Sequence, residues 1–260
     1  ILIAPLMTCS ARLPVYILLI AAFIPNTTVW GGIGLQGLVM FGLYAIGVVG
    51  ALLAAGVLRL TVLRGNRQAL LMELPSYKWP NPANVLLGLW DRAKIFIRRI
   101  GTIILSVLVV LWFLSTFPGA PAGATEPAIY YSFAGMIGRG LEPLLAPIGF
   151  NWQIAIALVP GLAAREVAVA ALGTVYALSG NEEAVTEALT TTLASQWSLA
   201  TALALLAWYV FAPQCLATLA AARRETNSWR WPAFMFVYLM ALAYVAALVT
   251  YRVALALGGG

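Results

Sequence analysis

The sequence predicts an all-α polytopic membrane protein, and three observations support this fold class. The 260 residues are 62% hydrophobic and only 9% charged, whereas a soluble domain keeps roughly a quarter of its residues charged. Several apolar segments approach the roughly 20 residues that a helix needs to cross a bilayer. Arginines gather in the connections between these segments, as expected of loops held at an anionic cytoplasmic leaflet.

Two helices are expected at the start of the chain. The first runs from about Pro14 towards Ile24, because a proline suits the first helical turn and Pro25-Asn26 ends the helix. The second spans Gly34 to about Leu60 and carries, after Gly34, five further glycines that allow close helix packing. Together with the later segments, we expect about five spanning helices.

A basic connection follows, and the positive-inside rule places it in the cytoplasm. Within it apolar residues recur at helical spacing, with charged residues between them, which predicts an amphipathic helix lying on the membrane surface. The apolar positions are Leu86, Leu89, Trp90, Ala93 and Ile97. The next span is expected over Phe96–Phe117.

The second half of the chain is less regular. Ile129–Phe150 is apolar but interrupted, Ser179–Gln196 is polar and acidic, and Ser198–Ala222 is a long apolar helix broken by Pro213. Pro232–Leu257 is the last expected span. The polypeptide begins in apolar sequence without a starting Met, so we interpret it as a piece of a longer protein.

Arg165 and Glu166 lie inside an otherwise apolar run, Ile154–Leu178. A charge in lipid costs roughly 2.5–3.5 kcal/mol on insertion scales, so such groups are expected to pair or to face a polar cavity. Pro160-Gly161 just upstream is expected to break the helix and release backbone carbonyls, which is how transporters build ion sites. Glu166 is therefore a candidate cation ligand or proton relay, and the alternative is a buried charge network that locks helices together.

The distribution of charge favours a hairpin over a single crossing for Asn151–Leu178. A hairpin that turns near Pro160-Gly161 leaves the acidic segment outside and Arg223–Arg230 inside, in agreement with the positive-inside rule. A single crossing would invert that bias.

The two cysteines, Cys9 and Cys215, are far apart in the sequence and imply no disulfide framework. Cys9 precedes a helix N-terminus, where the dipole favours the thiolate that binds metal, and Ser10 adds a hydroxyl. Pro213 cannot donate to the carbonyl of Tyr209, and a thiolate with free carbonyls suits a borderline ion such as Fe²⁺. Alternatively, both cysteines are small buried apolar residues.

Two further charged residues have open interpretations. Arg12, close to Cys9, would repel a cation unless an acid neutralises it, and it is either a gating partner or a headgroup-binding arginine. Glu142 lies three residues after Arg139 and is a candidate partner of Arg165.

Several motifs together resemble the membrane domain of the ferrous iron transport protein B family (FeoB), in family order and over nearly the whole chain. They are Pro5–Tyr16, Met72–Tyr77, Trp90 with Phe96–Gly101, Gly135–Pro143, Gly161–Val167 with Leu172-Gly173, and Pro213–Thr218 with Arg224-Glu225. The resemblance implies a Fe²⁺ permease in the bacterial inner membrane, with a broken or re-entrant gate-type hairpin. Cys9, Glu166 and Cys215 would be its metal ligands. Gating would involve Ser10, Arg12, Glu142, Pro160, Gly161, Arg165, Pro213 and Thr218.

The resemblance divides the chain into residues 1–82, with the first membrane helices, and 83–260, with the amphipathic helix and a second gate-type repeat. The family's GTP-binding domain and first gate repeat would precede Ile1, and the sequence has no Gly-x-x-x-x-Gly-Lys-Ser/Thr motif. GTP and Mg²⁺ would therefore act only through that domain, and no cofactor is expected in this chain. The bilayer, the GTPase domain and small cytoplasmic accessory proteins are the implied partners, and a homo-oligomer is open.

Three other functions remain as alternatives. A gate-type transporter of a nucleoside or other small solute would need more polar side chains within the spans than this sequence has. A cysteine-nucleophile enzyme is disfavoured because the chain has no histidine to act as its usual base. A non-conducting membrane scaffold is disfavoured by the two intramembrane charges, and nucleic-acid binding by the lack of a clustered basic surface.

Overall fold

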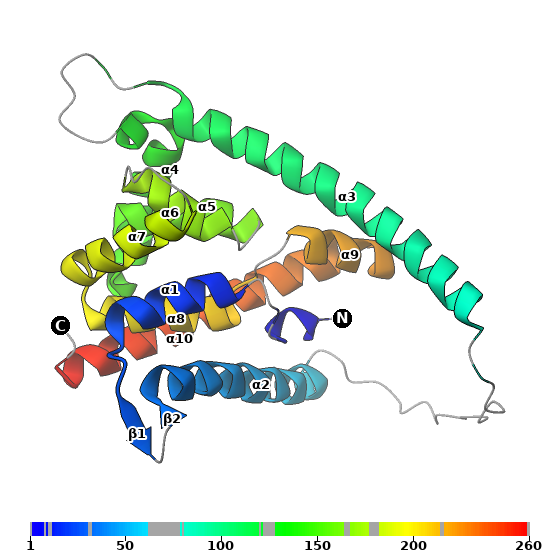
Figure 1. Ribbon diagram of the computed structural model, residues 1–260, viewed down its shortest axis with the longest axis horizontal. Helices are drawn as coiled ribbons and strands as arrows, with labels where there is room; N and C mark the ends of the chain where they lie inside the picture. Colours follow the sequence, from blue (N-terminus) through cyan, green and yellow to red (C-terminus); the bar gives the residue numbers. More distant parts are fainter. Residues whose placement is uncertain are drawn as a thin grey trace.

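A computed structural model describes residues 2–7, 9, 12–30, 33–61, 79, 81–119, 121, 128–163, 167–176, 182–213 and 216–258. The elements in chain order are η1 (Ala4–Leu6), α1 (Leu13–Phe23), β1 (Thr28–Trp30), β2 (Ile33–Gly34), α2 (Leu35–Thr61), α3 (Pro82–Thr116), η3 (Ala128–Tyr131), α4 (Phe133–Leu145), η4 (Ala146–Ile148), α5 (Trp152–Ala163), α6 (Val167–Val175), α7 (Glu182–Gln196), α8 (Leu199–Phe211), α9 (Leu216–Thr226) and α10 (Arg230–Ala256). The predicted helical membrane fold is confirmed (Figure 1). The small antiparallel pair of β1 and β2 is an addition that the sequence did not predict.

Within the described residues, α2 and α10 are each long and apolar enough to cross a membrane. Phe133–Ile148 and Trp152–Val159 meet the same criterion together, but they are bent by 111° at the break between them. The apolar helices α1 and α8 have 11 and 13 residues, so at 1.5 Å per residue each covers about 16–20 Å of a roughly 30 Å hydrocarbon core. Short and bent helices thus stand beside two full-length spans.

The core forms around α8, which packs along α10. Ala204 on α8 and Ala243 and Ala247 on α10 are fully buried, and small side chains at such a contact let two helix backbones approach closely. Helix α1 packs on α8 as well, and in Figure 1 it lies in front of that pair. The alanine-rich composition of these segments therefore sets the close packing at the centre of the molecule.

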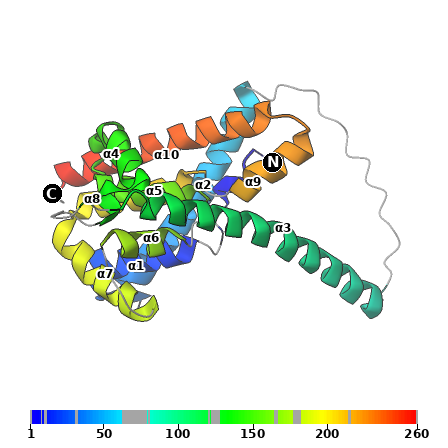
Figure 2. The same cartoon turned by 90° about the horizontal axis from the view of Figure 1, so that it is seen from above.

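Helix α3 joins two segments that the sequence predicts to be separate helices. It runs without interruption from Pro82 to Thr116 and begins with Asn81, whose Oδ1 accepts from the backbone N–H of Ala83 at 3.0 Å. No proline follows the first turn, so nothing in the sequence stops the helix between the amphipathic part and the apolar part. The expected surface helix is thus the continuation of the apolar segment, and its N-terminal end extends away from the other helices (Figures 1 and 2).

The acidic segment that follows the α5–α6 region is also helical. Leu189 and Leu193 of α7 are fully buried, whereas Glu187 is exposed. The face of α7 that carries these two leucines packs against α1. The polar segment therefore covers part of the core instead of forming a loop.

Candidate functional site

The bend before the candidate site lies at Gly149. This residue has φ +78°, a conformation that favours glycine, and a Cβ built on it would overlap the ring of Tyr251. Asn151 then starts α5, because its Oδ1 accepts from the N–H of Ile154 at 3.0 Å. These two residues explain why the chain turns sharply between α4 and α5.

The predicted helix break at Pro160-Gly161 is wrong, because α5 continues through both residues to Ala163. A proline inside a helix removes one N–H donor, here the one for the carbonyl of Ile156, without necessarily ending the helix. Arg165 and Glu166, which lie between α5 and α6, fall outside the described residues.

The chain nevertheless folds back within this region, as the hairpin prediction expected. A Cβ on Gly161 would lie 3.3 Å from the Cβ of Ala168. Residues seven apart in one continuous helix are separated by about 10 Å along its axis, so this contact requires a reversal of direction. Helices α5 and α6 pack on each other accordingly (Figure 1), and the reversal comes after Ala163 rather than at Pro160.

The same glycine brings the α5–α6 hairpin against α8. A Cβ on Gly161 would lie 3.1 Å from the hydroxyl oxygen of Tyr209, and the tyrosine is 4% exposed. The sequence indicated a role only for the carbonyl of Tyr209, and the position of its side chain was not predicted. The available signal was a phenol one helical turn before Pro213 in an otherwise apolar helix.

The predicted break at Pro213 is present. Helix α8 ends at Phe211, Ala212 is extended with ψ 145°, Pro213 is buried, and α9 begins at Leu216. A residue before proline is pushed out of the helical region, and Pro213 cannot donate to the carbonyl of Tyr209. Thr218 lies half-buried in the first turn of α9, whereas Cys215 falls outside the described residues.

Cys9 and Arg12 lie at the start of α1. The thiol of Cys9 is exposed, so it is not the buried apolar residue of the alternative interpretation. The backbone N–H of Arg12 donates to the carbonyl of Cys9 at 3.3 Å, and its guanidinium Nη2 donates to the carbonyl of Pro5 at 2.9 Å. The neighbouring Ser10 falls outside the described residues.

Glu142 is half-buried in α4. Its neighbour Arg139 lies over the ring of Tyr130, with the guanidinium carbon 4.0 Å from the ring centre. The described residues include no group of three or more acidic, cysteine or histidine side chains placed to hold a metal ion, and two of the three expected ligands, Glu166 and Cys215, are not among them.

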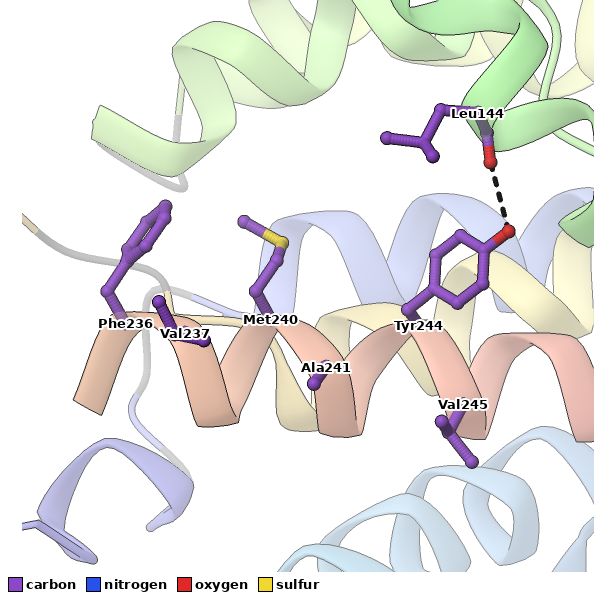
Figure 3. Close-up of a pocket in the computed structure, with 7 residues that line it drawn as sticks. All are labelled: Leu144, Phe236, Val237, Met240, Ala241, Tyr244 and Val245. Atoms are coloured by element: carbon purple, nitrogen blue, oxygen red, sulfur yellow. Dashed lines mark hydrogen bonds between the residues drawn. The ribbon is translucent and has the colours of Figure 1, made fainter. Parts of the chain in front are cut away.

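A groove of about 390 Å³ lies between α10 and α4. Its lining residues are all apolar except for the phenol of Tyr244, which donates to the carbonyl of Leu144 at 3.0 Å (Figure 3). The lining residues are Leu144, Phe236, Val237, Met240, Ala241, Tyr244 and Val245. Such a lining offers no ligand to a cation, so the candidate site remains at the α1, α5–α6 and α8–α9 interruptions.

Two family models match the chain. A Gate model described as "Nucleoside recognition" matches residues 97–229, about half of the chain, and the model "Ferrous iron transport protein B C terminus" matches residues 40–92. No solved structure matches the chain.

Curated relatives cover nearly the whole chain. An Fe(2+) transporter FeoB of Leptospira interrogans is 36% identical over 97% of this chain and 38% of its own length. A Staphylococcus aureus FeoB is 36% identical over 97% of this chain and 36% of its own length. A Porphyromonas gingivalis "Fe(2+) transport protein A/Fe(2+) transporter FeoB fusion protein" is 32% identical over 97% of this chain and 34% of its own length.

The chain thus spans just over a third of the length of these relatives. The two family models lie in sequence along it, and the relatives align from end to end, so the match extends beyond either model alone. The chain belongs to the ferrous iron transport protein B family and corresponds to the C-terminal part of its membrane region.

Proposed function

We propose that the chain forms the membrane part of a GTPase-linked Fe²⁺ uptake permease. The observation that carries this proposal is the contact between the α5–α6 hairpin and the interrupted helix α8, through Gly161 and Tyr209. A hairpin packed against a broken helix is the arrangement that transporters use to surround an ion with polar backbone inside the membrane. Relatives that align with 97% of the chain are named Fe(2+) transporters, which supports iron as the cargo.

In this proposal, Cys9, Glu166 and Cys215 are the ligands that the ion meets. Thiolate and carboxylate groups together suit a borderline divalent ion such as Fe²⁺ better than Mg²⁺ or Ca²⁺. The exposed thiol of Cys9 is reachable from solvent. Pro160 cannot donate to the carbonyl of Ile156, which adds a backbone oxygen to these ligands.

Gating in this proposal is a repacking of the hairpin against α8. The remaining candidate residues, Ser10, Arg12, Glu142, Arg165 and Thr218, would act there as charge partners or hydrogen-bonding groups. Interfaces between packed helices tend to have discrete arrangements instead of deforming continuously, which suits an open and a closed state.

The wider setting is also part of the proposal. Residues 1–82 and 83–260 form two regions of a multi-pass protein of the bacterial inner membrane, coupled to the GTPase domain of the full-length protein. The fusion of Fe(2+) transport protein A to the P. gingivalis relative supports a small accessory protein as a partner. Any chemistry on GTP belongs to that other domain, and homo-oligomers are compatible with this arrangement.

The test is Fe²⁺ uptake by cells that carry the full-length protein with Glu166→Gln, Cys9→Ser or Cys215→Ser. Each change removes one ligand, and we expect uptake to fall on the order of tenfold or more, since even residues that only orient a ligand contribute that much. The matched control is Glu225→Gln, which removes an exposed acid at the end of α9 and should leave uptake unchanged. Normal uptake by all three variants at equal membrane expression would exclude the proposed ligands.

A further inference from the structure

The N-terminal end of α1 holds a buried positive charge. Arg12 is 1% exposed, although its side chain is fully charged. Nη2 donates to the carbonyl of Pro5, but Nε and Nη1 are buried without an acceptor among the residues that the structure describes. Nε and Nη1 carry three of the five N–H groups of a guanidinium, so most of the donors of this side chain are unsatisfied there.

The first turn of α1 adds donors and a partial positive charge to the same place. Arg12 occupies the N-cap position and its side chain makes no capping hydrogen bond, whereas Ser, Thr, Asp and Asn are the usual residues that accept from the first-turn amides. Those amides, on Leu13 and Val15, need acceptors from outside the helix. Nη2 of Arg12 donates to the carbonyl of Pro5, seven residues earlier, so the guanidinium belongs to the same N-terminal end of α1 as these amides.

A buried guanidinium and a helix N-terminus both favour a negatively charged partner. Burial of a charge without a partner is strongly destabilising, and the N-terminus of a helix favours anions. None of the acidic side chains that the structure describes, those of Asp91, Glu142, Glu187 and Glu225, pairs with Arg12. Among the residues that the structure describes, Nε and Nη1 of Arg12 therefore have no acceptor.

We propose that Arg12 and the first turn of α1 bind one small monovalent anion from solution, with chloride as the abundant example. The 1% exposure of the side chain favours an ion of this size over a lipid headgroup, which would have to open the core to reach it. The bound anion neutralises the positive charge three residues from Cys9. The site does not depend on the iron proposal, because the charge has to be balanced whatever the chain carries.

The experiment measures thermal unfolding of the purified full-length protein in detergent, with chloride replacing gluconate at constant ionic strength. A ligand that binds only the folded state raises the unfolding temperature, and we expect a saturable rise of a few degrees in the wild type. Arg12→Gln removes the charge and should abolish the rise. The control Arg223→Gln should keep it, because Arg223 is exposed over the ring of Trp229.

A second measurement detects binding without unfolding. Chloride-35 NMR should show line broadening with the wild type that bromide reverses by competition. Arg12→Lys keeps the charge but loses the planar donor set, so half-saturation should need on the order of tenfold more chloride. This variant and the NMR signal decide the question if Arg12→Gln does not fold. The proposal is overturned if chloride changes neither the unfolding temperature nor the line width of the wild type. It is also overturned if chloride raises the unfolding temperature of Arg12→Gln as much as that of the wild type.

Discussion

At the scale of single residues, Gly161 decides how closely the hairpin approaches α8. Its hydrogen occupies the position where a Cβ would lie 3.1 Å from the Tyr209 hydroxyl oxygen and 3.3 Å from Ala168 Cβ. Both distances are tighter than ordinary van der Waals contact, so one methyl group requires a shift of a few tenths of an ångström. A larger side chain must displace either α6 or Tyr209, because protein interiors have little free volume.

We predict that Gly161→Leu lowers Fe²⁺ uptake by the full-length protein and destabilises it by roughly 1–3 kcal/mol through overpacking. Gly140→Leu is the matched control, since Gly140 is an exposed helical glycine on which an added Cβ would meet no neighbour within 4 Å. Uptake and thermal unfolding in detergent would both be measured. Equal behaviour of the two variants would contradict a special role for the Gly161 contact.

A double-mutant cycle separates the contact with Tyr209 from the contact with Ala168. Gly161→Ala places its methyl group near the Tyr209 hydroxyl, and Tyr209→Phe removes that oxygen. We expect the second change to recover part of the uptake that the first one loses, with a non-additive effect typical of residues in contact. Strict additivity of the two changes would show that the hydroxyl is not the limiting neighbour.

Some residue-level features followed from the sequence and others did not. Pro213 ends α8 as predicted, because the missing N–H and the restriction on Ala212 are properties of the chain itself. The side chain of Tyr209 was missed, because its position on Gly161 depends on how two helices distant in sequence pack. The burial of Arg12 likewise depends on η1 folding over the start of α1.

At the scale of elements, the bend between α4 and α5 positions the hairpin. The 111° angle is achieved at Gly149, and the ring of Tyr251 on α10 fills the space that a side chain would need. A boundary between Phe150 and Asn151 was expected from the sequence, and the structure forms it with a glycine turn and an Asn151 cap. The break expected at Pro160 is a different one, and α5 continues through that residue to Ala163.

We predict that Gly149→Ala destabilises the protein clearly more than Gly258→Ala. Both glycines have positive φ, +78° and +89°, so both changes incur the strain of a left-handed residue, roughly 1–2 kcal/mol. Only Gly149→Ala adds an overlap with Tyr251, because nothing lies within 4 Å of a Cβ added at Gly258. The difference in thermal unfolding between the two variants therefore isolates the packing term, and equal losses would contradict it.

At the scale of the whole molecule, hydropathy predicted the class but not the path of each segment. The two full-length spans, α2 and α10, lie where continuous apolar sequence placed them. We expected about five spanning helices. Among the described helices, two are long and apolar enough to cross a membrane, or three if the bent pair counts as one span. Short helices such as α8 are stabilised by burial among neighbouring helices. The length of an apolar run in the sequence does not predict this packing.

The fold-back between α5 and α6 has a consequence for the sides of the membrane, and cysteine labelling can test it. A hairpin enters and leaves on one face of the membrane, so α7 with its acidic residues should lie outside. Arg223, Arg224 and Arg230 should then face the cytoplasm, as the positive-inside rule requires.

In a protein with Cys9 and Cys215 replaced by serine, a cysteine at Glu183 should react with an impermeant reagent added to intact cells. A cysteine at Ser228 should react only after the cells are opened, like a reference cysteine at Arg92 in the basic connection. If the cysteine at position 183 reacts only after the cells are opened, residues 151–178 cross the membrane once, in spite of the contact between Gly161 and Ala168.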